Sequence, residues 1–145
     1  MLVVPDASVI LKLVLEREDE ADLLNAFHII DEFLAGTIEI RLPSLWRYEV
    51  GNTLGMKRSR MAKDAMETLL AYEFEEESLH REYCLDVLGF MAEVKGISFY
   101  DASYHVLALR EGGMYVTADQ RYIGRAGGKG HVLLLSQWKS PTRRQ

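Results

Sequence analysis

The candidates for a shared chemical role are four carboxylates that stand within or directly after apolar segments of the sequence. Asp6 and Asp119 each follow a short apolar run, while Glu49 and Asp101 interrupt largely apolar segments. Buried Asp and Glu are rare unless they are paired or hold a metal. Four carboxylates at one point would repel each other, and a divalent cation removes that conflict. A carboxylate set without Cys or His suits Mg²⁺, and Mn²⁺ fits as well.

The elements that must position these acids alternate along the chain. Apolar and alternating runs predict strands at residues 2–4, 38–42, 75–79, 114–117 and 131–135. Helical spacing predicts helices at residues 8–15, 20–34, 45–57, 62–74, 80–95, 99–111 and 120–125, the third capped by Ser44. Strands that alternate with helices predict an α/β fold with a central parallel β-sheet covered on both faces.

This arrangement is expected to gather the acids at one edge of the sheet. Ligands of open parallel sheets bind beyond the carboxyl ends of the strands. Asp6 and Asp119 each come just past such an end. Asp101 lies in the first turn of the helix that leads into the strand before Asp119, and Glu49 lies on the helix at residues 45–57.

Each acid also has an ordinary structural explanation. Asp6 and Asp119 can cap the helices that follow them, because Asp favours that position. Asp101 can interact with the dipole at the start of its helix. Glu49 has the weakest alternative, since Arg47 and Asn52 are poor partners for it within its helix.

Composition bounds the class of protein. The 145 residues, 48% hydrophobic and 27% charged, predict one globular domain spanning residues 1–145. The single cysteine, Cys84, excludes an intrachain disulfide and favours a reducing, cytoplasmic location. There is no signal-peptide pattern and no apolar stretch long enough for a bilayer, so no membrane association is expected.

Charge is less favourable to a nucleic-acid protein, because the formal net charge is −5. The charges are unevenly distributed, however: Asp119 is the only acid after Glu111, and basic residues follow it, which weakens the argument against nucleic-acid binding. Basic residues also follow the Glu49 helix and are candidates to contact an RNA backbone, although a solvated helix end explains them equally well. They are Lys57, Arg58, Arg60 and Lys63.

Aromatic and histidine side chains offer further candidates. Tyr48 and Trp46 are able to stack on bases, but core or dimer packing is the better explanation for Trp46. His105 lies four residues after Asp101, and a core or surface histidine is favoured over a metal ligand.

Four short segments, in order, resemble the motifs of the PIN-domain family. They are Val4-Pro5-Asp6-Ala7-Ser8-Val9-Ile10, Trp46-Arg47-Tyr48-Glu49-Val50-Gly51-Asn52, Ser98-Phe99-Tyr100-Asp101-Ala102 and Val116-Thr117-Ala118-Asp119-Gln120-Arg121-Tyr122. In size and motif wording the chain is most similar to the VapC-like toxins of VapBC toxin–antitoxin pairs. The resemblance covers nearly the whole chain.

The resemblance implies a three-layer α/β/α sandwich and a ribonuclease that depends on Mg²⁺ or Mn²⁺. Asp6, Glu49, Asp101 and Asp119 would bind metal or position the attacking water, supported through hydrogen bonds by Ser8 and Thr117, although these two hydroxyls can also bond local backbone. A homodimer and a VapB-like antitoxin are implied as partners, with 5′-phosphate and 3′-hydroxyl products. The chain departs from many members in having no acid after Asp119, which leaves one or two metals open.

Other functions fit the sequence less well. A non-catalytic binding module on the same scaffold has no need for four mutually repelling carboxylates. A receiver domain needs an acceptor Asp at the end of a middle strand, whereas the mid-chain acid here is Glu49 on a helix. A dehalogenase-type phosphatase needs Asp where this chain has Ser8. RNA and DNA both remain open as substrates.

Overall fold

The computed structural model describes residues 1–15 and 22–141, and in them five parallel strands form one sheet. The strands are β1 (Leu2–Pro5), β2 (Glu39–Pro43), β3 (Glu75–Glu77), β4 (Met114–Thr117) and β5 (Val132–Leu134). Their order is β3-β2-β1-β4-β5, and every neighbouring pair is parallel. The predicted central parallel sheet is confirmed.

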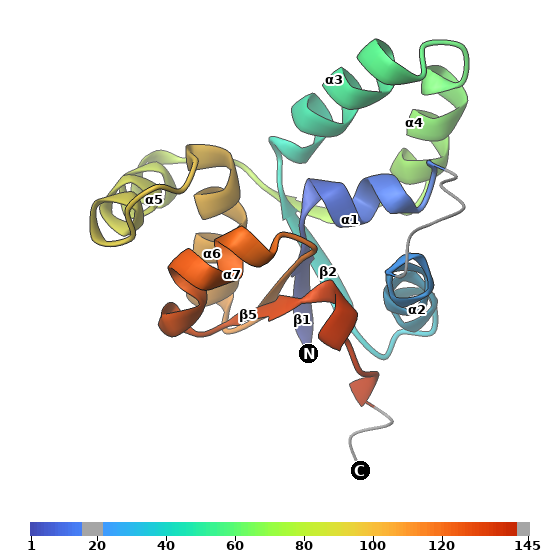
Figure 1. Cartoon of the computed structure of the whole chain (residues 1–145). Coiled ribbons are helices and arrows are strands. Elements are labelled where there is room, and N and C mark those ends of the chain that lie inside the picture. Colours follow the sequence, from blue (N-terminus) through green and yellow to red (C-terminus); the bar gives the residue numbers. More distant parts are fainter. Residues whose placement is uncertain (16–21, 142–145) are drawn as a thin grey trace.

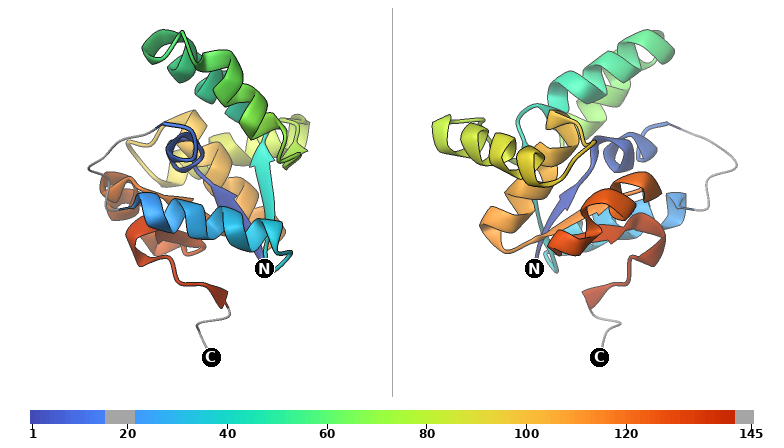
Figure 2. Two further views of the ribbon diagram at one scale, coloured as in Figure 1. Left: turned by 90° about the vertical axis from the view of Figure 1, so that its right-hand side faces the viewer. Right: turned by 60° about the vertical axis from the view of Figure 1, so that its left-hand side comes forward.

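Helices cover both faces of this sheet. Two helices, α1 (Ala7–Lys12) and α2 (Leu23–Leu34), connect β1 to β2. Two more, α3 (Trp46–Lys57) and α4 (Ala62–Leu70), connect β2 to β3. The helices α5 (Arg81–Glu93) and α6 (Phe99–Glu111) connect β3 to β4, and α7 (Gln120–Ala126) lies between β4 and β5. Figures 1 and 2 show α1 and α2 on one face and α5 to α7 on the other, which confirms the α/β/α sandwich. The α3–α4 pair extends past the carboxyl ends of the strands (Figure 1).

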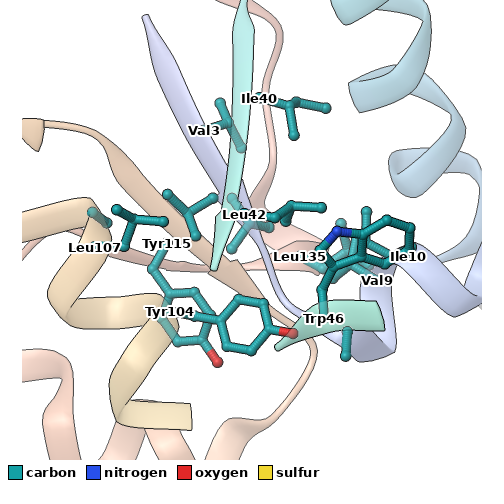
Figure 3. Packing of buried hydrophobic residues seen from close by; sticks show 14 of the residues in the cluster. Val3, Val9, Ile10, Ile40, Leu42, Trp46, Tyr104, Leu107, Tyr115 and Leu135 are labelled. Atoms are coloured by element: carbon teal, nitrogen blue, oxygen red, sulfur yellow. The ribbon is translucent and has the colours of Figure 1, made fainter. Parts of the chain in front are cut away.

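The core lies on the three inner strands of the sheet, β2, β1 and β4. Val3 and Val4 of β1 and Tyr115 and Val116 of β4 have no exposed surface. Figure 3 shows side chains from both faces packing on this part of the sheet. Gly113, just before β4, lets β4 approach β1 closely, because a Cβ at this position would lie 2.7 Å from the backbone oxygen of Leu2.

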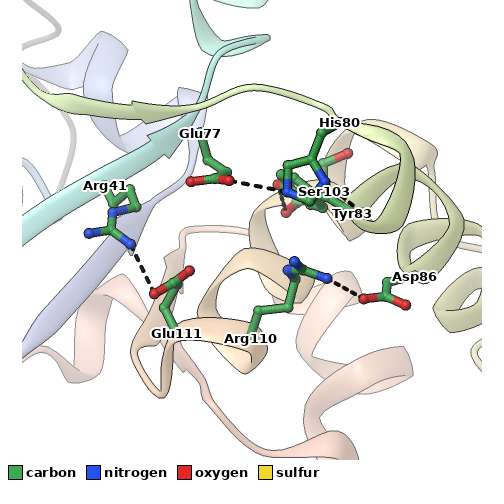
Figure 4. Close-up of polar contacts among 8 residues, drawn as sticks. All are labelled: Arg41, Glu77, His80, Tyr83, Asp86, Ser103, Arg110 and Glu111. Atoms are coloured by element: carbon green, nitrogen blue, oxygen red, sulfur yellow. Dashed lines mark hydrogen bonds and ion pairs between the residues drawn. The ribbon is translucent and has the colours of Figure 1, made fainter.

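The sheet edge at β3 carries three glutamates and is tied to its neighbours by charge. Arg41 of β2 forms ion pairs of 2.9 Å with Glu75 and with Glu111 at the end of α6, the second drawn in Figure 4. Glu76 accepts hydrogen bonds from Trp46 Nε1 at 2.5 Å and from Arg47 Nε at 2.6 Å. These contacts fix the first turn of α3 against the edge strand.

Some predicted boundaries are wrong. Ser44 does not cap α3, whose cap position is Leu45 without a side-chain bond. The fourth helix ends at Leu70 rather than residue 74, because the chain turns at Glu73 with a positive φ and buries Phe74 against Trp46 and Phe33. Glu20, the predicted start of the second helix, lies outside the described residues.

Among residues 1–15 and 22–141, no helix has the length and apolar character needed to span a bilayer.

Candidate active site

Asp6 stands at the centre of the sheet, where the strand order reverses between β1 and β4. Its backbone N–H donates to the carbonyl of Val116 at 2.9 Å, so Asp6 continues the pairing of β1 with β4. The crevice beyond the carboxyl ends of two such strands is where open sheets bind ligands. The fold thus places Asp6 at the mouth of this crevice.

The Asp6 carboxylate is held by two hydroxyl groups. Oδ2 accepts hydrogen bonds from Ser8 Oγ at 2.9 Å and from Thr117 Oγ1 at 3.2 Å. Asp6 occupies the cap position of α1, yet its side chain makes no capping bond, so the capping explanation is wrong. Only 8% of the residue is exposed. A buried carboxylate that does not cap its helix requires another explanation.

Glu49 and Asp101 share an open hollow of about 550 Å³ with Asp6. Glu49 comes from α3, and its Oε1 accepts a hydrogen bond of 2.8 Å from the Tyr104 hydroxyl. Asp101 lies in the first turn of α6, which is capped by Ser98 rather than by Asp101 itself. The hollow is lined by Asp6, Ala7, Ser8, Leu11, Tyr48, Glu49, Asn52, Thr53, Tyr100 and Asp101.

Asp119 is placed differently from the other three acids. It caps α7, since its Oδ1 accepts from the backbone N–H of Arg121 at 2.9 Å and of Tyr122 at 3.2 Å. It lines a separate hollow of about 440 Å³. The Thr117 hydroxyl nevertheless accepts from the Asp119 N–H at 3.1 Å, which links it to the residue that holds Asp6. The capping explanation therefore holds for the Asp119 side chain, although Asp119 still lies at the same edge of the sheet as Asp6.

Electrostatics couple the acids to one another. Burial, with the charges of Asp101 and Glu49, raises the pKa of Asp6 to about 7, against the lowering effect of Ser8 and Thr117. Burial and the Asp101 charge also raise the pKa of Glu49. Burial and the Asp119 charge raise the pKa of Asp101. Like charges gathered at a partly buried site are a common signature of function.

Comparisons with known proteins identify the family. The profile of the PIN domain matches residues 3–129. The chain belongs to the PIN domain family. This confirms the family resemblance found in the sequence. No curated protein gives a significant sequence match to the chain.

Solved structures share the PIN fold over nearly the whole chain. The structure of VapBC2 from Rickettsia felis, bound to a DNA fragment from its promoter, has a TM-score of 0.67 at 13% identity, covering 92% of this chain and 97% of that one. FitAB bound to the IR36 DNA fragment has a TM-score of 0.69 at 10% identity, covering 94% and 97%. PAE2754 from Pyrobaculum aerophilum has a TM-score of 0.62 at 24% identity, covering 93% and 84%. At these identities the likeness concerns the fold.

The donor set of this PIN domain fits a hard divalent cation, which PIN nucleases generally use. Asp6, Glu49 and Asp101 offer only carboxylate oxygens, and burial together with neighbouring carboxylates raises the pKa of each, a cost that a cation relieves. In the described part of the chain no three His, Cys, Asp or Glu side chains are close enough together to enclose an ion. Mg²⁺ is usually held by one or two carboxylates and keeps several waters, so a loose set remains compatible with it.

Several other candidates lie away from the hollow. Lys57, Arg58, Arg60 and Lys63 are exposed at the far end of α3 and beyond it, and none lines the hollow. Trp46 is buried in the core and cannot stack on a base, whereas Tyr48 is 81% exposed beside Glu49. His105 is a buried core histidine, bonded to the Tyr122 hydroxyl and to the Gly130 carbonyl, each at 2.7 Å.

Sequence reasoning missed Tyr104, Tyr100 and Thr53 as parts of the site. Tyr104 follows Asp101 by three residues, so the two share a side of α6. That spacing was the available signal, but it does not say that α3 brings Glu49 to the Tyr104 hydroxyl.

Proposed function

We propose that this PIN domain is a ribonuclease that depends on Mg²⁺ or Mn²⁺. The observation that carries the proposal is the buried Asp6 carboxylate, which Ser8 and Thr117 hold beside Glu49 and Asp101. PIN domains are generally nucleases. Burying a carboxylate is costly, and a function that uses its charge accounts for its presence.

Asp6, Glu49 and Asp101 would hold the cation, directly or through the waters it keeps, with Asp119 at the margin of the site. When bound, the cation supplies positive charge to the phosphate and makes water a better nucleophile. The chain's own residues orient these groups. Ser8 and Thr117 aim Oδ2 of Asp6, and Tyr104 occupies Oε1 of Glu49, which leaves Oε2 to orient the attacking water. Water adds to phosphorus as the bond to the 3′ oxygen breaks. The water gives up a proton to Glu49 Oε2, and the departing 3′ oxygen takes a proton from solvent, giving a 5′-phosphate and a 3′-hydroxyl.

The test is a Mn²⁺ titration by calorimetry with parallel cleavage of a labelled single-stranded RNA. The wild-type chain is expected to bind Mn²⁺ and to cleave, and EDTA to stop cleavage. Asp6→Asn should lose both, whereas Asp64→Asn, at an exposed acid of α4, should lose neither. Cleavage that persists in EDTA or in Asp6→Asn would contradict the proposed metal-dependent activity. An absence of Mn²⁺ binding and cleavage in the wild type would favour the non-catalytic binding module.

Matched oligonucleotides decide between the two nucleic acids. RNA and DNA strands of the same sequence, incubated with Mn²⁺, are expected to give cleavage of the RNA. Lys57, Arg58 and Arg60 are proposed to contact its backbone phosphates, because all three are exposed and basic. Replacing them with Gln should weaken binding and flatten its dependence on salt. An unchanged salt dependence would remove them from the RNA site.

We also propose that the chain is the toxin half of a type II toxin–antitoxin pair, acting in the cytoplasm. The support is the VapC-like motif wording and the shared fold with VapBC2 and FitAB, whose structures contain DNA fragments. The expected partners are a small VapB-like antitoxin encoded next to this gene and a second copy of the chain. Co-expression should give a complex that neutralises cleavage, and light scattering should give the mass of a homodimer. A free, active monomer without such a neighbouring gene would contradict this assignment.

A further inference from the structure

Tyr104 lies directly behind the acidic hollow without lining it. It has no exposed surface, and its hydroxyl donates to Glu49 Oε1 at 2.8 Å. Tyr104 belongs to α6 and Glu49 to α3, so this hydrogen bond joins the helix of Asp101 to the helix of Glu49. Through this hydroxyl, α6 on one side of the hollow holds the Glu49 carboxylate of α3 on the other side.

The position of this hydroxyl is set by the core. The Tyr104 ring stacks on Tyr115 of β4, with centroids 6.0 Å apart and planes inclined by 24°. Tyr115 has no exposed surface either, and Figure 3 shows both rings inside the buried cluster. A ring fixed in this way presents its oxygen at one place, whereas the Glu49 side chain has several rotatable bonds.

Glu49 needs such a restraint. The first turn of α3 is fixed by Glu76, but this contact does not reach the Glu49 carboxylate. The negative charge of Asp101, which lines the same hollow, repels the Glu49 carboxylate. We propose that Tyr104 is a positioning residue whose hydroxyl holds the Glu49 carboxylate in the acidic hollow so that it can help bind the divalent cation.

This inference rests on the proposed metal-dependent function and adds a residue that touches neither metal nor substrate. Groups that hydrogen-bond to metal ligands typically change metal affinity about 10-fold to 100-fold when they are removed. Tyr104→Phe keeps the ring and its stacking and removes the one hydroxyl. Its Mn²⁺ dissociation constant is therefore expected to rise about 10-fold. Cleavage should recover at saturating Mn²⁺.

Tyr83→Phe is the matched control. Tyr83 is also fully buried, and its hydroxyl donates to the carbonyl of Ser103 at 2.5 Å; Figure 4 draws both residues. Ser103 directly precedes Tyr104 on α6. It does not line the hollow. Tyr83→Phe should lower the unfolding temperature by an amount similar to Tyr104→Phe while leaving Mn²⁺ affinity and cleavage unchanged.

Calorimetric Mn²⁺ titration of the wild type, Tyr104→Phe and Tyr83→Phe tests the proposal. A second measurement needs no metal: the unfolding free energies of Tyr104→Phe, Glu49→Ala and the double variant in EDTA. If the hydroxyl acts through Glu49, the changes in the two single variants do not add up to the change in the double variant. Wild-type Mn²⁺ affinity in Tyr104→Phe, or additive changes in unfolding free energy, would overturn the positioning role while the nuclease stands. A wild-type chain that binds no Mn²⁺ would overturn both.

Discussion

The hydroxyl of Thr117 donates a hydrogen bond to Oδ2 of Asp6 at 3.2 Å, although 111 positions separate the two residues in the chain. The same hydroxyl accepts the backbone N–H of Asp119 at 3.1 Å. One side chain at the end of β4 therefore connects the acid that follows β1 with the acid that follows β4. The central strand pair does more than bring two acids near each other, because it supplies the group that holds one of them.

Thr117→Val should weaken both stability and catalysis. Valine has nearly the same shape, but it leaves the Asp6 carboxylate and the Asp119 N–H without their buried partner. The free energy of unfolding is expected to fall by about 1–3 kcal/mol in urea denaturation. Ser8→Ala removes a donor to the same oxygen at an exposed position, where water can replace it, and should cost less. Equal losses in the two variants would contradict the special role of Thr117.

Asp6→Asn should stabilise the metal-free protein at neutral and higher pH. The pKa of Asp6 is raised from 3.8 to about 7 in the folded chain, so between these values the folded state binds more protons than the unfolded state. Stability that Asp6 contributes below about pH 4 is therefore lost as the pH rises through about 7. The advantage of Asp6→Asn should grow over this interval, to at most about 4 kcal/mol, at 1.36 kcal/mol per pKa unit.

Urea denaturation at several pH values in EDTA measures this effect. Asp64→Asn, the exposed control on α4, should show no such growing advantage. A constant difference between wild type and Asp6→Asn from pH 4 to pH 8 would show that the folded chain does not raise the pKa of Asp6.

Tyr48→Ala should weaken substrate binding without affecting the fold. Tyr48 is 81% exposed and lines the hollow next to Glu49, so its ring is free to stack on a base. Loss of one stacking contact of about 1–3 kcal/mol corresponds to a rise in KM of about 5-fold or more, with kcat changed little. Tyr48→Phe keeps the ring and should keep KM. Met56→Ala, at a residue of α3 that is 80% exposed and outside the hollow, is the control for a general surface effect.

The sequence predicted the sheet and the neighbourhood of Asp6 and Asp119 because both depend on local signals. Short apolar runs define strands, and the carboxyl ends of parallel strands share one edge. Side-chain pairing between helices carries no such signal. Nothing local to Tyr104 indicates that its hydroxyl meets Glu49, and nothing local to Asp119 distinguishes a capping carboxylate from one facing the hollow. Ser44 shows the converse, since a good capping residue is passed over when Trp46 and Arg47 anchor α3 to Glu76.

Gly113→Ala should be the most damaging of the simple glycine substitutions. A Cβ at this position would lie 2.7 Å from both the backbone oxygen and Cδ2 of Leu2. Leu2 begins β1, whose next residue, Val3, pairs with Met114, so relief of the clash would separate the two central strands. The free energy of unfolding should fall by about 2–3 kcal/mol, as for other overpacked cores.

The matched substitution is Gly55→Ala on α3, where an added Cβ meets nothing within 4 Å. There alanine should raise the free energy of unfolding by about 0.5–1 kcal/mol, since it favours the helix over glycine. Because Asp6 follows β1 and Thr117 ends β4, separation of these strands by Gly113→Ala should also weaken Mn²⁺ binding. An unchanged or increased free energy of unfolding in Gly113→Ala would show that the close approach of β1 and β4 does not govern this part of the fold.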